Sequence, residues 1–299
     1  MPKQGQLKIG GTVVNVSNLE KMLYPKAGFT KGQIIDYYIK VSPALLPHLK
    51  NRPITLKRYP EGVDGFFFYE RRCPAHRPDW IKTAKAPKTD GGDVDYCVMN
   101  NLAALVWAVN PADLELHTFL HLAPKMDVPK AVAFDLDPGA PANIVTCCKV
   151  GLELKKLFDE QKLESFPKTS GSKGLQIYVP LNSPTTYKKT KAFSHAVAEE
   201  LEKKLPQLVV SKMQKALRTG KVLVDWSQND HHKTTVCVYS LRAKDRPTVS
   251  TPVTWDEVVK AAKTNSILSF ETNDVLKRVE KHGDIFAPVL TLKQKLPSH

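Results

Sequence analysis

Two aspartates, Asp135 and Asp137, end a short apolar stretch and have the spacing that metal chemistry requires. They follow the residues Ala-Val-Ala-Phe at 131–134. Side chains of a β-strand alternate between its faces, so both carboxylates are expected on one face, a few Å apart. At that separation they repel each other unless a cation neutralises them, and Mg²⁺ or Mn²⁺ takes carboxylate oxygens readily. An Asp that caps the following turn explains one of these residues better than it explains both, so the pair predicts a metal site. Pro138-Gly139 is expected to end the strand.

A third acid, Asp225, closes a second apolar stretch. It follows Val-Leu-Val at 222–224 and precedes the polar residues Ser227, Gln228 and Asn229. Two-metal nucleotidyl transfer requires carboxylates of this kind: one ion activates the attacking 3′-hydroxyl, and the other neutralises the triphosphate and the leaving pyrophosphate. Asp225 is therefore the candidate third metal ligand.

A short loop rich in glycine and hydroxyl groups precedes the next strand. It reads Lys-Thr-Ser-Gly-Ser-Lys-Gly at 168–174 and contains Ser170 and Lys173. Backbone amides, hydroxyls and an ammonium group are suited to holding a triphosphate. The spacing of a Walker A loop and the helix after it are both missing. A flexible hairpin turn is the alternative interpretation.

His117 and Arg242 also follow apolar, strand-like stretches, where each side chain is a candidate phosphate contact. The alternatives are a histidine satisfied by the backbone and a surface arginine. Near the N-terminus, Lys21 and Lys31 surround the start of a helix that the capping box Thr30-x-x-Gln33 predicts. A helix N-terminus with lysines is a ready phosphate site, although a solvated basic face is the common alternative.

A run of aromatic residues follows a turn near Lys57. Phe66 and Phe67 belong to the run Gly-Phe-Phe-Phe-Tyr at 65–69, whose side chains must face alternate ways. One or two of these rings are candidates for stacking on a base, and a two-sided core is the alternative.

Composition narrows the classes of partner. The 299 residues contain 42% hydrophobic residues, enough for a sizeable core, and 44 Lys and Arg against 30 Asp and Glu give a net charge of +14. Such a chain is attracted to polyanions, nucleic acid first. Neither an apolar signal sequence nor an apolar run of membrane-spanning length is present, so no membrane association is expected.

Five cysteines, without a repeated CxxC spacing, indicate neither a disulfide framework nor a zinc finger. A reducing cytoplasm is the compartment that fits them. Cys73-Pro-Ala-His76 has no second pair of ligands and is interpreted as a structural loop.

The elements that must position these residues mix strands and helices without strict βαβ repetition, so the fold class is α/β or α+β with more than one sheet. One compact unit with two lobes is expected, an N-terminal lobe of about 1–125 and a catalytic core of about 126–299. Strands are predicted at 6–16, 54–59, 66–69, 131–137, 175–181, 222–225 and 235–239. Helices are predicted after Thr30, at 100–109 and at about 145–161, 192–205, 255–263 and 274–281.

Four motifs, in this order, resemble the polymerase domain of bacterial ligase D, a member of the archaeo-eukaryotic primase superfamily that serves non-homologous end joining. They are Asp-Leu-Asp-Pro-Gly at 135–139, Ser-Gly-Ser-Lys-Gly-Leu at 170–175, Val-Asp-Trp-Ser-Gln-Asn at 224–229 and Tyr-Ser-Leu-Arg-Ala at 239–243. The similarity extends from about Leu7 to Pro288. It implies a primase-type catalytic core with its active site between two β-sheets.

The resemblance also implies roles for individual residues. It makes Asp135, Asp137 and Asp225 the ligands of catalytic Mn²⁺ or Mg²⁺. The positions that match the binding site of the incoming nucleotide are His117, Ser170, Lys173, Gln228 and Arg242. Those that match the pocket for a 5′-phosphate across a gap are Asn18, Lys21 and Lys31. Lys57 matches a DNA contact, and Phe66 and Phe67 match a ring pair against the template.

Two departures from the family pattern are visible. Gln176 stands where the family usually has His, and Gln keeps hydrogen-bonding capacity but cannot be cationic. No ligase-type Lys-x-Asp-Gly motif and no nuclease module accompany the polymerase region, which implies a free-standing polymerase or an excised domain.

The resulting hypothesis is a metal-dependent nucleotidyltransferase that fills gaps and extends DNA ends during break repair, with a preference for ribonucleotides. Its expected partners are DNA with gaps, overhangs or broken ends, NTP or dNTP, Ku and an ATP-dependent DNA ligase, in the cytoplasm at the nucleoid. A haloacid-dehalogenase-like phosphatase is the enzymatic rival, but it expects Gly-Thr where Pro138-Gly139 stands. Gap filling in excision repair or lesion bypass would use the same residues, and a non-catalytic DNA-end-binding protein is a rival of a different class.

Overall fold

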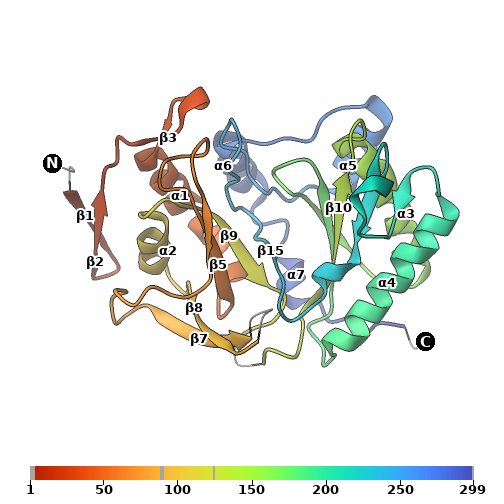
Figure 1. Cartoon of the computed structure of the whole chain (residues 1–299), viewed down its shortest axis with the longest axis horizontal. Helices are drawn as coiled ribbons and strands as arrows, with labels where there is room; N and C mark the ends of the chain where they lie inside the picture. The colour runs from red at the N-terminus through yellow and green to blue at the C-terminus, as the bar shows by residue number, and fades with distance from the viewer. Residues whose placement is uncertain (1–3, 88–90, 124, 298–299) are drawn as a thin grey trace. The chain divides into compact units, whose positions relative to one another are not determined.

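The computed structural model describes residues 4–87, 91–123 and 125–297, and these residues form two compact units. Unit 1 comprises Met1–Pro124, Thr234–Ser250 and Phe270–Asp284, and unit 2 comprises Lys125–Lys233, Thr251–Ser269 and Ile285–His299. Each unit combines helices with sheets (Figure 1), which confirms the predicted mixed α/β class. The linear division near residue 125 stays a prediction, because two later segments return to unit 1. No helix in the described part of the chain has the length and apolar character needed to cross a membrane.

The main sheet of unit 1 has the strand order β15-β9-β5-β8-β7, and every pair in it is antiparallel. The start of β5 pairs with β8, and its end pairs with β6. The strands are β5 (Pro53–Arg58), β6 (Phe68–Glu70), β7 (Lys82–Pro87), β8 (Asp93–Val98), β9 (Asp113–Phe119) and β15 (Thr234–Val236). The sequence patterns predicted β5 well, placed β6 two residues early and missed β7 and β8.

Helix α1 (Lys31–Leu49) begins at Thr30, as predicted. The Thr30 side chain accepts a hydrogen bond from the Gln33 amide, and the Gln33 side chain accepts one from the Thr30 amide. The apolar stripe of α1 is buried, and two tyrosines on it reach neighbouring backbone. The hydroxyl of Tyr37 donates to the Tyr239 carbonyl at 2.8 Å, and that of Tyr38 donates to the Leu114 carbonyl at 2.6 Å. Helix α1 therefore fixes β9 and the segment that leads to Arg242.

The described part of unit 1 also contains the helices α2 (Leu102–Val109) and α6 (Thr272–His282) and the short 3₁₀ helix η1 (Pro25–Ala27). The strand predicted at 6–16 is wrong as a single element: it is a hairpin of β1 (Gln4–Ile9) and β2 (Thr12–Ser17). Gly10 and Gly11 turn the chain with φ of +54° and +85°, conformations that glycine adopts without steric cost. A second small pair consists of β3 (Met22–Tyr24) and β4 (Phe29–Thr30).

The sheet of unit 2 has the order β11-β12-β10-β14-β13, with β10 antiparallel to both of its neighbours. Its strands are β10 (Ala131–Pro138), β11 (Phe166–Thr169), β12 (Leu175–Pro180), β13 (Val209–Val210) and β14 (Val222–Asp225). Strand β10 ends at the predicted Pro138. The patterns missed β11, which has no apolar alternation of its own, and β13, which has only two residues.

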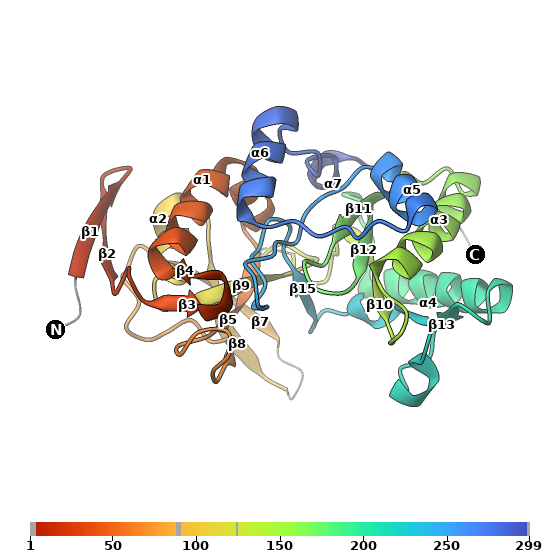
Figure 2. The same cartoon turned by 90° about the horizontal axis from the view of Figure 1, so that it is seen from above.

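Helices α3 (Ile144–Glu160) and α4 (Tyr187–Lys204) lie side by side against this sheet (Figure 2). The ring of Phe134 on β10 packs against Phe158 of α3 and Phe193 of α4. Residues of β10 alternate, so the helices cover the face that carries Phe134, and Asp135 projects from the other face. Helix α5 (Trp255–Thr264) packs on α3, and α7 (Pro288–Thr291) packs near β12. Short turns η2 (Lys215–Arg218) and η3 (Trp226–Gln228) flank β14.

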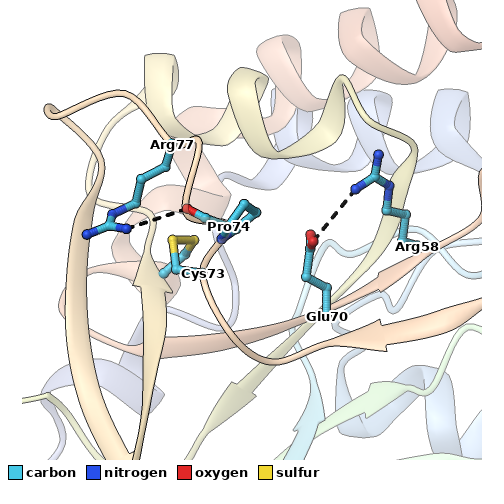
Figure 3. Close-up of a disulfide and its surroundings, with 6 residues drawn as sticks. Arg58, Glu70, Cys73, Pro74 and Arg77 are labelled. Atoms are coloured by element: carbon cyan, nitrogen blue, oxygen red, sulfur yellow. Dashed lines mark hydrogen bonds and ion pairs between the residues drawn. A yellow bond between two sulfur atoms is a disulfide. The ribbon is translucent and has the colours of Figure 1, made fainter.

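Cys73 and Cys97 form a disulfide in unit 1, which the sequence did not reveal (Figure 3). The segment after β6 runs beside β8, where the Cys73 amide donates to the Asp95 carbonyl and the two Cα atoms lie 4.9 Å apart. Expecting no disulfide was wrong for this pair, because residues 24 positions apart become neighbours only through strand pairing. The bond occupies the sulfur of Cys73, in agreement with a structural role for the loop at 73–76. Cys147, Cys148 and Cys237 are buried and are not part of a disulfide among the described residues.

Candidate active site

The centre of the site in unit 2 is a row of polar side chains that crosses four strands. Asp135 lies directly opposite Asp225 of β14 on one side and Gln176 of β12 on the other. Directly opposite residues of neighbouring strands share a face, with Cβ atoms about 5 Å apart. Asp137 lies two residues further along β10 on the same face and is exposed. The predicted pair and the predicted third acid are thus brought together by register. Gln176 in turn lies directly opposite Lys168 of β11. We call Lys168, Gln176, Asp135 and Asp225 the polar row.

The turn after β14 fixes the Asp225 carboxylate. The Ser227 amide and hydroxyl donate to its Oδ1 at 2.9 and 2.6 Å, and Gln228 Nε2 donates to its Oδ2 at 2.8 Å. Buried Asn229 anchors this turn, because its side chain accepts from the Ala133 amide and donates to the Ala133 carbonyl. Gln228, a predicted nucleotide ligand, therefore contacts a carboxylate in this structure.

The Asp135 carboxylate is placed at an electrostatic cost. Burial and the charges of Asp137 and Asp225 raise its pKa to about 7, against the opposing effect of the hydrogen bond from Gln176. Its Oδ2 accepts that bond at 2.9 Å, whereas its buried Oδ1 has no hydrogen-bond partner among the described residues. A divalent cation would offset the repulsion and coordinate an oxygen that otherwise loses its hydration. The donor set therefore fits a hard divalent metal ion.

The loop at 170–174 is a closed turn rather than an extended one. The Ser170 amide donates to the Gly174 carbonyl, and the Ser170 hydroxyl oxygen accepts from the amides of Ser172 and Gly174. Ser170 is buried, whereas Lys173 is exposed. The loop therefore presents Lys173 to solvent, while Ser170 holds its shape.

Gly174 should tolerate no side chain, because a Cβ there would lie 2.2 Å from the Leu136 carbonyl oxygen of β10. Gly174→Ala is expected to lower the free energy of unfolding by about 3 kcal/mol, since backbone on both sides must move. Urea unfolding measures this. Gly5→Ala is the matched control, because its Cβ would meet Val16 at an ordinary 3.4 Å. Equal stability of both variants would contradict the close packing of the loop on β10.

In unit 1, the buried carboxylate of Glu115 gathers the predicted phosphate contacts. His117 Nε2 lies 2.9 Å and Arg242 Nε 3.2 Å from Glu115 Oε2, and the Ala243 amide donates to Oε1 at 3.0 Å. Although burial opposes ionisation, His117 and Arg242 hold the pKa of Glu115 well below its ordinary value. Burial, together with the charges of Arg242 and Lys57, lowers the pKa of His117 against the raising effect of Glu115. Because an ionised Glu115 only accepts, His117 donates from Nε2, which leaves Nδ1 as the acceptor of a neutral ring.

Lys57 lies among aromatic rings of the same unit. Its ammonium is 4.1 Å from the ring centroid of Phe67, 5.1 Å from that of Tyr59 and 5.5 Å from that of Tyr69. Phe66 keeps 70% of its surface exposed and Phe67 keeps 45%. Exposed rings beside a cation are typical of surfaces that stack on nucleic-acid bases. Phe66 and Phe67 are therefore not part of a buried two-sided core, which was the alternative interpretation of this run.

Backbone hydrogen bonds hold together the basic cluster at the start of α1, which consists of Asn18, Lys21 and Lys31. The Asn18 carbonyl accepts from the Lys21 amide, and the amides of Lys31 and Gly32 donate to the carbonyls of Lys21 and Leu19. With the Thr30 cap, the amides of residues 31–33 are all engaged. Lys21 is exposed, whereas the buried ammonium of Lys31 donates to the Asn110 carbonyl at 2.9 Å. Burial and then Lys21 lower the pKa of Lys31. A phosphate at this end would be held by side chains rather than by these amides.

The structure thus collects the candidate residues into two groups within unit 1, one group around Glu115 and Lys57 and one at the start of α1. A third group is formed in unit 2 by the acids, Gln228 and the loop at 170–174. The sequence patterns assigned no role to Glu115 or Lys168. Glu115 could have been found from its two-residue spacing to His117, which places both side chains on one face of a strand. Lys168 could be found only once the pairing of β11 was known.

Comparison with known proteins gives concordant results. A family model described as LigD, primase-polymerase domain, matches residues 30–286. The chain is 37% identical over 278 residues to the multifunctional non-homologous end joining protein LigD of Mycolicibacterium smegmatis, covering 92% of the chain and 36% of that relative. It is 32% identical over 268 residues to the bifunctional LigD of Bacillus subtilis, with coverages of 89% and 42%. The chain therefore spans less than half the length of these relatives.

A solved structure, the polymerase domain from Mycobacterium tuberculosis ligase D in complex with DNA, matches with a TM-score of 0.87 and 35% sequence identity. The match covers 94% of this chain and 99% of that one. The family match over most of the chain and this structural likeness show that the chain belongs to the LigD primase-polymerase family, whose members are DNA-directed nucleotidyltransferases.

Proposed function

We propose that this protein is a metal-dependent polymerase that fills gaps and extends DNA ends during double-strand break repair by non-homologous end joining. The observation that carries the proposal is the convergence of Asp135, Asp137 and Asp225 on one face of one sheet. The names of the relatives, which are non-homologous end joining proteins, and the DNA complex of the solved relative support the pathway and the substrate.

Asp135, Asp137 and Asp225 would hold Mn²⁺ or Mg²⁺. Bound there, divalent ions supply acidification of the primer 3′-hydroxyl and neutralisation of the triphosphate. The reaction is the attack of that hydroxyl on the α-phosphate of an incoming NTP or dNTP, with release of pyrophosphate. His117, Ser170, Lys173, Gln228 and Arg242 would bind and orient the nucleotide. The exposed Lys173 is the cation of this set best placed to meet a mobile triphosphate.

We assign Asn18, Lys21 and Lys31 to a 5′-phosphate on the far side of a gap. The charge of Lys21 lowers the pKa of Lys31, so the two ammonium groups repel each other, and an anion beside them would relieve that repulsion. Lys57, Phe66 and Phe67 would contact DNA, the rings against the template. A preference for ribonucleotides, action with Ku and an ATP-dependent DNA ligase, and a place at the nucleoid in the cytoplasm complete the proposal.

The proposal predicts that a labelled primer on a duplex with a short gap is extended in Mn²⁺ and that a 5′-phosphate across the gap strengthens the extension about tenfold. Ribonucleotides and deoxyribonucleotides are compared in parallel reactions. Tight DNA binding without any incorporation would refute the polymerase assignment and leave an end-binding protein.

Lys21→Ala is expected to remove most of the advantage given by the 5′-phosphate while leaving extension of the unphosphorylated gap unchanged. Lys40→Ala is the matched control, because Lys40 is an exposed lysine of α1 that pairs with Asp36. An advantage of the same size in Lys21→Ala and in the wild type would place the 5′-phosphate elsewhere.

A further inference from the structure

The polar row contains a buried lysine for which the proposed reaction has no role. Lys168 of β11 is only 1% exposed and lies directly opposite Gln176. Its Nζ donates to Gln176 Oε1 at 2.5 Å, and Gln176 Nε2 donates to Asp135 Oδ2 at 2.9 Å. An ammonium group and a metal-site carboxylate are thus joined through a single amide. Lys168 also lies 5.7 Å from the ring centroid of Tyr178 on the same face.

The two end groups determine how the central amide is oriented. An ammonium group can only donate hydrogen bonds, and an ionised carboxylate can only accept them. Gln176 satisfies both only with its oxygen toward Lys168 and its nitrogen toward Asp135. If the ammonium were removed, the amide would lose the donor that holds its oxygen on the β11 side, and it could flip its oxygen toward the carboxylate. The direction of the Gln176 amide is therefore set from β11.

The position of this lysine also balances charge. Burying an ammonium group is unfavourable unless opposite charge compensates it. Asp135 lies one strand beyond Gln176, and the charge of Lys168 favours its ionised form. Because Gln176 holds Oδ2, the carboxylate can rotate little, and its other oxygen, Oδ1, is left without a hydrogen-bond partner in the described chain. The row therefore selects which oxygen of Asp135 is presented.

We propose that Lys168 is a positioning residue that acts through Gln176 to hold the Asp135 carboxylate in the orientation that presents Oδ1 to a divalent metal ion. The proposal rests on the proposed polymerase function and adds to it a residue that touches neither metal nor substrate. It also explains how Gln176 serves this chain: a neutral amide can accept from one side and donate to the other at the same time.

The first test observes the amide directly in the metal-free protein. In protein labelled with ¹⁵N-glutamine, the Gln176 side-chain signals are assigned by their loss in Gln176→Leu. Lys168→Met keeps an unbranched buried side chain without charge, and we expect exchange of the Gln176 amide protons with solvent to become at least about tenfold faster. Lys155→Met is the matched control, because Lys155 pairs with Asp159 on α3 and should leave the signals unchanged.

The second test is a double-mutant cycle. Lys168→Met and Gln176→Leu are each expected to lower kcat about tenfold or more, and the double variant should be no slower than the poorer single variant, because both remove one link. Stability should behave differently. Gln176→Leu leaves a buried ammonium without this partner, whereas the double variant replaces both polar groups and should recover stability in urea unfolding. If the double variant recovers stability while its kcat stays low, the loss of activity comes from lost positioning and not from impaired folding.

Unchanged Gln176 exchange in Lys168→Met would overturn the proposal, and so would single-variant losses in kcat that multiply in the double variant. If the wild-type protein incorporates no nucleotide, the polymerase assignment fails, and the exchange measurement alone decides the role of Lys168.

Discussion

Asn in place of Asp135 is expected to reduce nucleotide incorporation by about a thousandfold or more. Asn has the shape of Asp and can still accept the hydrogen bond that Gln176 donates. It removes a negative charge from the strand position opposite Asp225 and two residues from Asp137. Because hard divalent cations depend on carboxylate charge, the site should lose its metal affinity while the sheet stays intact. Primer extension on the gapped duplex, with kcat and KM for the nucleotide, measures the effect.

Asp159→Asn is the matched control for this substitution. Asp159 lies on α3, where it forms an exposed ion pair with Lys155. Loss of such a pair changes little, so incorporation should stay within about twofold of the wild type. The Asp135→Asn protein should still bind gapped DNA, since the basic clusters of unit 1 are untouched. Incorporation at the wild-type rate by Asp135→Asn would show that these acids do not form the metal site.

The second large effect concerns stability and pH in the absence of metal ions. The folded-state pKa of Asp135 is about 7, whereas the pKa of an Asp in the unfolded chain is about 3.9. Between these values the folded state binds more protons than the unfolded state, so this residue lowers the free energy of unfolding as pH rises. Asp135→Asn removes that effect. In EDTA the two proteins should have similar stability near pH 4, and the variant should be more stable by about 4 kcal/mol at pH 8.

The difference in stability between the wild type and Asp135→Asn isolates the contribution of Asp135 to the pH dependence. Groups that contribute with the opposite sign, such as Glu115, whose pKa is lowered, are present in both proteins. Urea unfolding at several pH values provides the comparison. Adding Mn²⁺ at pH 8 should stabilise the wild type and not the variant, because only the wild type retains the full set of carboxylates. A constant difference in stability across the pH range would contradict the raised pKa of Asp135.

Local rules explain what could be predicted. The Thr30 capping box depends on residues three apart, so it fixes the start of α1 from the sequence alone. The alternation of β10 depends only on strand geometry, so it places Asp135 and Asp137 on one face. The alternation of β12 likewise puts Gln176 and Tyr178 together, although both faces of this strand are buried. Patterns of this kind also located most helices to within a few residues.

Features that depend on distant strands escaped prediction for a common reason. The turn at Gly10 and Gly11 divides one apolar alternation into two strands without changing its pattern. The pairing of Cys73 with Cys97 depends on where the chain returns beside β8. Strand β11 contains a proline and a lysine in four residues and has no apolar alternation of its own. It is a strand because β12 offers it hydrogen bonds.

The family of this protein, its mixed α/β class and the pair of carboxylates on β10 were predictable from the amino-acid sequence, because they follow from ordered motifs and from the period of a strand. The three-dimensional fold was needed to show that Asp225 and Gln176 lie opposite Asp135, and that a buried Lys168 lies at the end of the same row. Register across strands is set by packing of the whole sheet against α3 and α4, and no local pattern contains that information.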